Sequence, residues 1–170
     1  MARSLVDVLN LNPDLQVLWK LKYDWESDPE FKGIVLSALG SDRLRISSWL
    51  LPETVSFLTS GNVVVFVHHG GANSYYEACY AGVPQIVLPV WYDTFHYAAK
   101  VEFLGLGLHG NKGSEPGVSN AGLTKALTTV LTDSVMKEKA KAIGELCRKT
   151  VGREVACDQI TKLARGGRQV

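Results

Sequence analysis

Cysteine is scarce in this sequence, and its spacing excludes two common ways of stabilising a small domain. The three cysteines, Cys79, Cys147 and Cys157, include no CxxC pair and leave one residue over. An odd number without paired spacing argues against a disulfide framework and against a structural zinc site. The four histidines also lack the spacing of metal ligands. The sequence therefore predicts a domain of a reducing compartment, with no metal site.

Long apolar runs and an excess of charge of one sign are also missing. No apolar run reaches the length of a membrane span, and the first 14 residues lack the apolar core of a signal peptide. We therefore expect a cytoplasmic protein without a transmembrane segment. The formal net charge is +1, which gives no general attraction to nucleic acid, so no nucleic-acid partner is expected.

The composition and length fit one globular domain over residues 1–170. Hydrophobic residues make up 46% of the chain and charged residues 21%, as in ordinary globular proteins. A chain of 170 residues can bury a substantial core. A single domain is the simplest organisation, because the sequence contains no repeats or low-complexity segments.

Short apolar runs alternate with segments of helical pattern. The expected strands are 15–21, 43–47, 63–67 and 85–89, and the expected helices are 74–81, 94–104, 120–131 and two within 134–165. Residues 22–42 are rich in Asp, Glu, Ser, Pro and Gly, and are expected to form an exposed loop. The alternation predicts an α/β fold, a Rossmann-like three-layer domain with a parallel sheet.

The stretch that follows the 63–67 strand has the composition of an anion-binding turn. Gly70 and Gly71 permit unusual dihedral angles and a close approach by a ligand. The helix behind them offers free N–H groups and the positive end of its dipole, and His69, Asn73 and Ser74 stand where they could add donors. Such a turn suits a phosphate group without any Lys or Arg.

Other interpretations of this region stand beside the anion site. Paired glycines after a strand can form an ordinary turn, and Asn73-Ser74 can be an ordinary N-cap. His68 is expected to turn into the sheet or to pack locally. The G-x-G-x-x-G match at 105–110 is followed by a loop, so it is not expected to bind a dinucleotide.

Residues 67–93 resemble the donor-binding signature of family 1 UDP-glycosyltransferases, which have the GT-B fold; their sequence is VHHGGANSYYEACYAGVPQIVLPVWYD. The family pattern is roughly H-x-G-x-N-S-x-x-E, then G-V-P, then P-x-x-x-D-Q. All of it matches except the last residue, which is Thr94. The segment WLLP (49–52) is similar to the tryptophan-proline element that precedes this signature.

The resemblance implies which residues contact the two ends of the donor, the uracil base and the transferred sugar. Trp49 is expected to stack on uracil, with the backbone of Leu50 or Leu51 reaching the base edge. Asp93 is expected to contact hydroxyls of the transferred sugar. Thr94 stands where the family usually has Gln and cannot make the same bidentate contact, which leaves the sugar preference open.

The resemblance also implies which residues contact the diphosphate and the ribose of the donor. The resemblance implies that His69 hydrogen-bonds the diphosphate together with Asn73 and Ser74. Gly71 is expected to allow the backbone approach, and Glu77 to hold the ribose hydroxyls. No Asp-x-Asp occurs, so metal-independent binding is expected.

The resemblance also implies that the chain is the C-terminal half of a GT-B glycosyltransferase. The N-terminal acceptor domain, which supplies the catalytic His of these inverting enzymes, is absent, and so is the first strand of the C-terminal half. No catalytic residue is therefore predicted here, and no cofactor beyond the UDP-sugar donor. We expect the chain alone to bind UDP or a UDP-sugar weakly and to turn over nothing. The alternatives are the donor-binding subunit of a two-chain glycosyltransferase and a non-catalytic nucleotide-sugar-binding module.

Overall fold

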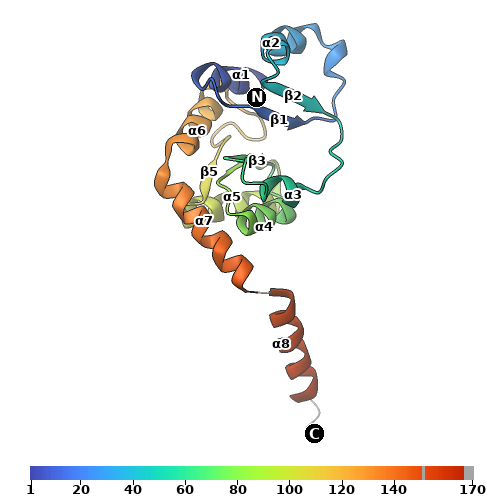
Figure 1. Cartoon of the computed structure of the whole chain (residues 1–170), viewed down its shortest axis with the longest axis vertical. Coiled ribbons are helices and arrows are strands. Elements are labelled where there is room, and N and C mark those ends of the chain that lie inside the picture. Colours follow the sequence, from blue (N-terminus) through green and yellow to red (C-terminus); the bar gives the residue numbers. More distant parts are fainter. Residues whose placement is uncertain (151, 167–170) are drawn as a thin grey trace.

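The fold is described from a computed structural model, which covers residues 1–150 and 152–166. Helices and short strands alternate along the chain (Figure 1). The helices are α1 (Ala2–Leu11), α2 (Pro29–Gly40), α3 (Thr54–Leu58), α4 (Ala72–Ala81), α5 (Tyr92–Leu104), α6 (Asn120–Thr132), α7 (Ser134–Lys149) and α8 (Gly152–Gly166), with a 3₁₀ turn η1 (Trp25–Ser27). The strands are β1 (Val17–Lys20), β2 (Leu44–Ser47), β3 (Phe66–His68), β4 (Gln85–Val87) and β5 (Gly107–His109). The predicted α/β class is confirmed.

All strand pairs of the described residues are parallel, but they form two sheets. β1 pairs with β2, with Val17 opposite Leu44. The second sheet has the order β3-β4-β5, with Phe66 opposite Gln85 and Gln85 opposite Gly107. The predicted parallel arrangement is confirmed. The strands were expected to form one sheet, but β1 and β3 are not hydrogen-bonded to each other, so the strands divide into two sheets.

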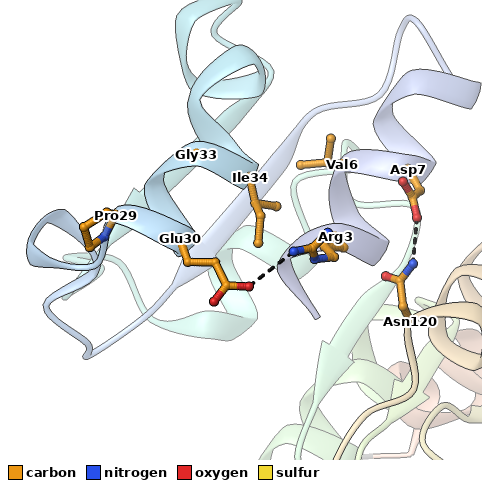
Figure 2. Close-up of a pocket in the computed structure, with 8 residues that line it drawn as sticks. All are labelled: Arg3, Val6, Asp7, Pro29, Glu30, Gly33, Ile34 and Asn120. Carbon is orange, nitrogen blue, oxygen red and sulfur yellow. Dashed lines mark hydrogen bonds and ion pairs between the residues drawn. The ribbon is translucent and has the colours of Figure 1, made fainter.

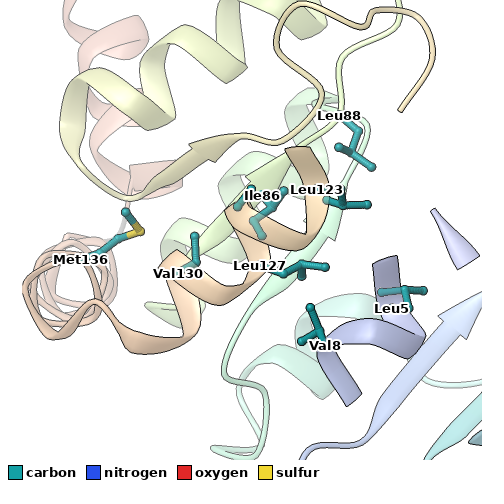
Figure 3. Close-up of a cluster of buried hydrophobic side chains, with 9 residues drawn as sticks. Leu5, Val8, Ile86, Leu88, Leu123, Leu127, Val130 and Met136 are labelled. Carbon is teal, nitrogen blue, oxygen red and sulfur yellow. The ribbon is translucent and has the colours of Figure 1, made fainter. Parts of the chain in front are cut away.

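One apolar cluster joins the two sheets and the helices beside them. Figure 3 shows side chains of α1, α6 and α7 converging on Ile86 of β4. Val17 and Trp19 of β1 and Val67 of β3 also pack against this cluster. Each fully buried aliphatic side chain stabilises the fold by about 1.5–3 kcal/mol. Strands of both sheets are therefore held by a shared core.

The prediction of an exposed loop over 22–42 is wrong, because η1 and α2 occupy most of this segment. Asp28 caps α2, its carboxylate accepting from the Phe31 amide at 3.0 Å, and Pro29 takes the first helical position. The buried side chains of this helix are those of Val35 and Ala38. Gly33 and the charged residues of the segment hide the apolar period in the sequence.

Three predicted boundaries around the glycine turn are displaced. The strand expected at 63–67 begins only at Phe66, since its first ladder bond runs from the Phe66 amide to Pro84 O and β4 itself begins at Gln85. The helices expected to start at residues 74 and 94 each start two residues earlier, as α4 and α5. Asn73 and Ser74 consequently lie inside the first turn of α4.

The last helix stands apart from the rest of the described structure. α8 extends away from the body of the molecule (Figure 1) and has no buried residue. Among residues 1–150 and 152–166, no helix combines the length and apolar character that crossing a bilayer would require.

Candidate functional site

The turn between β3 and α4 requires glycine at position 70. Gly70 has φ of +90°, and a Cβ there would lie 2.8 Å from the backbone O of Thr94 in α5. Gly71 has an ordinary extended backbone, and a Cβ there would meet only the exposed His69 ring, which could move aside. The first glycine is therefore needed for its backbone conformation and for the close approach of α5, whereas the second leaves room for the His69 ring in its present position. The turn is therefore compact around its own side chains.

The N-terminus of α4 presents backbone donors to the outside of this turn. Gly71 is the N-cap, and its carbonyl accepts from the Tyr75 amide at 3.1 Å. The amides of Ala72, Asn73 and Ser74 have no partner within the helix, as in any first turn. No side chain within the described part of the chain caps this end. The arrangement leaves donors and the positive helix end available to an anion.

Asn73, Ser74 and Glu77 lie on α4 beside these donors. Asn73 is exposed, and Ser74 and Glu77 are half-buried. Residues three or four apart lie on one helix face, so Glu77 lies one turn beyond Asn73 and Ser74. The carboxylate is thus set back from the helix tip, where it would repel phosphate less and could accept from hydroxyl groups.

His68 supports the turn from inside the protein, as predicted for this residue. Its Nδ1 accepts from the Gly70 amide at 3.1 Å, so Nε2 carries the proton that is donated to Gln85 Oε1 at 2.9 Å. Burial lowers the pKa of His68 from 6.5 to about 4. Gln85 in turn donates to Cys79 Sγ at 3.5 Å. Gln85 is not among the residues predicted from the sequence, although a polar residue opening a buried strand could have indicated this role.

His69 is exposed at the mouth of the turn, in contrast to His68. Its ring centroid lies 6.3 Å from that of Trp91, with the two rings tilted by 53°. Trp91 is the N-cap of α5 and is 57% exposed. Trp91 is not among the residues predicted from the sequence, because it comes to lie beside His69 only when the chain folds.

The two residues predicted to bind the sugar differ sharply in exposure. Asp93 is exposed in the first turn of α5. Thr94 is 1% exposed, and its hydroxyl accepts from the amides of Val90 and Trp91, both at 3.2 Å, and donates to Trp91 O. The side chain of Thr94 therefore closes the 89–94 turn and does not face a ligand. The assignment of Thr94 as a donor-binding residue stays a prediction, and its hydroxyl is already occupied within the turn.

Trp49 and Leu51 lie on the segment between β2 and α3. Trp49 is 60% exposed, and Lys20 Nζ and Lys22 Nζ lie 4.4 and 5.5 Å from its ring centroid. Leu51 is 95% exposed. An exposed cation–π contact is worth only about 0.5–1 kcal/mol, so a flat base could displace these ammonium groups from the ring. The Trp49 ring therefore stays available, with contacts only from side chains at and just beyond the end of β1.

Two hollows of the described residues lie apart from the glycine turn. One, of about 570 Å³, lies between α1, α2 and the start of α6, where Arg3 pairs with Glu30 and Asp7 accepts from Asn120 (Figure 2). The other, of about 350 Å³, includes Ser47 and Ser48 just before Trp49. Neither includes a residue of α4 or α5, so the candidate site is the exposed surface at the N-termini of these two helices. Within the described residues, no group of three His, Cys, Asp or Glu side chains could hold a metal ion.

Comparison with known proteins points to one enzyme class. The profile of the erythromycin biosynthesis protein CIII-like, C-terminal domain matches residues 36–160. Glycosyltransferase sdnJ of Sordaria araneosa is 39% identical over 185 residues, covering 94% of this chain and 36% of the relative. UDP-glucuronosyltransferase 2A3 of Homo sapiens is 30% identical over 131 residues, covering 77% and 22%. The chain thus spans 36% of the length of the first of these curated relatives and 22% of the second.

Solved structures show the same arrangement of elements. A UDP-glucose: anthocyanidin 3-O-glucosyltransferase in complex with UDP superimposes with a TM-score of 0.72 at 26% identity, covering 88% of this chain and 32% of that one. Medicago truncatula UGT71G1 complexed with UDP-glucose also gives a TM-score of 0.72, at 25% identity and the same coverage. Both neighbours hold a uridine nucleotide.

Proposed function

The chain belongs to the family of erythromycin biosynthesis protein CIII-like C-terminal domains, which are donor-binding domains of glycosyltransferases. We propose that it is the UDP-sugar-binding half of an inverting UDP-glycosyltransferase that transfers a hexose to an acceptor hydroxyl. The observation that carries the proposal is the uncapped N-terminus of α4 beside the exposed His69. Two of the similar structures are described as complexes with UDP and UDP-glucose.

The diphosphate of the donor is proposed to bind at the start of α4. The amides of residues 72–74 point at the phosphate oxygens, and the helix end contributes about 0.3–2 kcal/mol per unit charge. His69 adds a side-chain donor from the mouth of the turn. As the bond to the sugar breaks, negative charge builds up on the diphosphate, and the same donors stabilise the leaving group.

The remaining contacts position the two ends of the donor. Glu77 accepts from ribose hydroxyls, and Asp93 accepts from hydroxyls of the sugar. Trp49 provides a flat face for the uracil once Lys20 and Lys22 move aside. Holding the donor in this way lowers the entropic cost of the transfer, while the base that deprotonates the acceptor belongs to the other half of the enzyme.

Calorimetry with UDP on the purified chain and two variants tests this proposal. His69→Ala removes a donor to the diphosphate and Glu77→Ala removes an acceptor for the ribose, so each is expected to weaken UDP binding by roughly tenfold. Glu138→Ala is the matched control, since it removes an exposed carboxylate on α7, outside the residues assigned to the donor. Equal UDP affinity in all four proteins would reject the site.

We propose further that the chain alone is inactive. The base that deprotonates the acceptor is expected to come from the other half of the enzyme, so incubation with UDP-glucose and a panel of alcohols should yield no glycoside. Sugar transfer by the purified chain would contradict this part of the proposal while leaving the binding site intact.

Exposed apolar residues favour a second candidate, a donor-binding subunit that works with a separate acceptor-binding chain. Leu51, two residues beyond Trp49, is 95% exposed, and Tyr92 is 94% exposed. Such side chains suit an interface that closes over the donor. Co-purification of the native chain with an acceptor-binding protein would favour this candidate, and its isolation as part of one longer polypeptide would exclude it.

A further inference from the structure

We infer that the indole of Trp91 is a binding surface for the ring of the donor sugar. This inference rests on the proposed function, because it takes the diphosphate to lie at His69 and the start of α4. Trp91 is more than half exposed, and its ring centroid lies 6.3 Å from that of His69. A sugar linked to a diphosphate at His69 would therefore extend over or beside the indole.

The backbone that carries Trp91 is held in place by Thr94. The Thr94 hydroxyl accepts from the Trp91 amide at 3.2 Å and donates to the Trp91 carbonyl, and the Thr94 amide also donates to that carbonyl at 3.0 Å. Thr94 itself lies against Gly70, which fixes α5 to the glycine turn. An aromatic ring on such a fixed turn loses little conformational freedom when a ligand covers it.

The chemistry of the turn fits a pyranose ring. One face of a pyranose carries C–H groups, which an exposed indole can cover, while Asp93 in the same helical turn can accept from the hydroxyls. The Thr94 hydroxyl is fully used within the turn, so it is not free to bind the sugar. The exposed groups that flank the sugar in this inference are the Trp91 indole and the Asp93 carboxylate.

The neighbouring aromatic residue provides a matched control. Tyr92 is 94% exposed at the first position of α5, but the ring contact of His69 is with Trp91. Trp91→Ala and Tyr92→Ala therefore remove exposed aromatic rings from adjacent positions, and only the first removes the ring beside the proposed phosphate site. Trp91→Phe keeps an aromatic face.

The experiment measures the affinities of UDP and UDP-glucose for the wild-type chain and the three variants by calorimetry. In Trp91→Ala the ratio of UDP-glucose to UDP affinity should fall about fivefold to tenfold, while UDP affinity itself stays within about twofold. Trp91→Phe should restore most of the ratio, and Tyr92→Ala should leave it unchanged. Circular dichroism establishes that each variant is folded.

The possible failures are distinguishable. An unchanged ratio in Trp91→Ala, or an equal loss in Tyr92→Ala, overturns the inference while UDP binding still supports the proposed function. Loss of UDP affinity in a folded Trp91→Ala would also overturn it, because the indole would then act on the nucleotide. Absence of UDP binding by the wild-type chain rejects the proposed function itself.

Discussion

At the scale of single residues, the protonation of His68 couples the glycine turn to pH. His68 is buried and neutral, with a pKa lowered to about 4, against about 6.5 when the chain is unfolded. Between these values the unfolded chain binds more protons, so the free energy of unfolding should decrease as the pH falls from 6.5 toward 4. The total loss should be at most about 3 kcal/mol, with no contribution from this residue above pH 6.5.

Urea unfolding at a series of pH values measures this dependence. His68→Gln cannot titrate, so its stability, although lower near pH 7 because the contacts to Gly70 and Gln85 change, should fall less steeply over the same range. Parallel pH profiles for the wild type and the variant would show that His68 is not the group responsible.

The residues of the turn could be predicted to different degrees for physical reasons. A tight turn at Gly70 could be predicted from local sequence, because a glycine pair after an apolar run indicates a turn, and Gly70 does adopt φ of +90°. The burial of Thr94 could not be predicted, since it depends on hydrogen bonds to Val90 and Trp91 that exist only in the folded turn. The assignment of ligand contacts to His69, Asn73, Ser74, Glu77 and Asp93 stays a prediction.

At the scale of secondary-structure elements, the Asp28 cap stabilises the start of α2 (Pro29–Gly40). The Asp28 carboxylate accepts from the Phe31 amide at 3.0 Å and from Tyr23 Oη at 2.8 Å, and the first of these bonds is the main reason that the pKa of Asp28 is lowered. Asp28→Ala should therefore destabilise the protein by about 1 kcal/mol, as measured by urea unfolding. Asp24→Ala is the control, because Asp24 precedes η1 without a capping hydrogen bond. Equal effects of the two substitutions would remove the cap as the explanation.

Elements with strong local signals were predicted well, and those stabilised by packing were not. The alternation of strands and helices and the resemblance to the C-terminal half of a GT-B glycosyltransferase are both confirmed. α2 was missed because Gly33 and its charged neighbours hide the period, whereas burial of Val35 and Ala38 against α1 and β2 stabilises it in the fold. The division of the strands into two sheets depends on long-range pairing, which periodicity does not report.

At the scale of the whole molecule, α8 contributes no side chain to the core. Its residues 152–166 are all exposed, including the apolar Val155, Ile160 and Leu163. Because unfolding free energy comes mainly from buried apolar surface, truncation after Thr150 should leave the urea midpoint and the affinity for UDP unchanged. Circular dichroism should show the loss of helical signal alone. A fall in stability of more than about 1 kcal/mol would mean that α8 packs onto the body in solution, and the apolar side chains of Val155, Ile160 and Leu163 would then belong to the core of this chain.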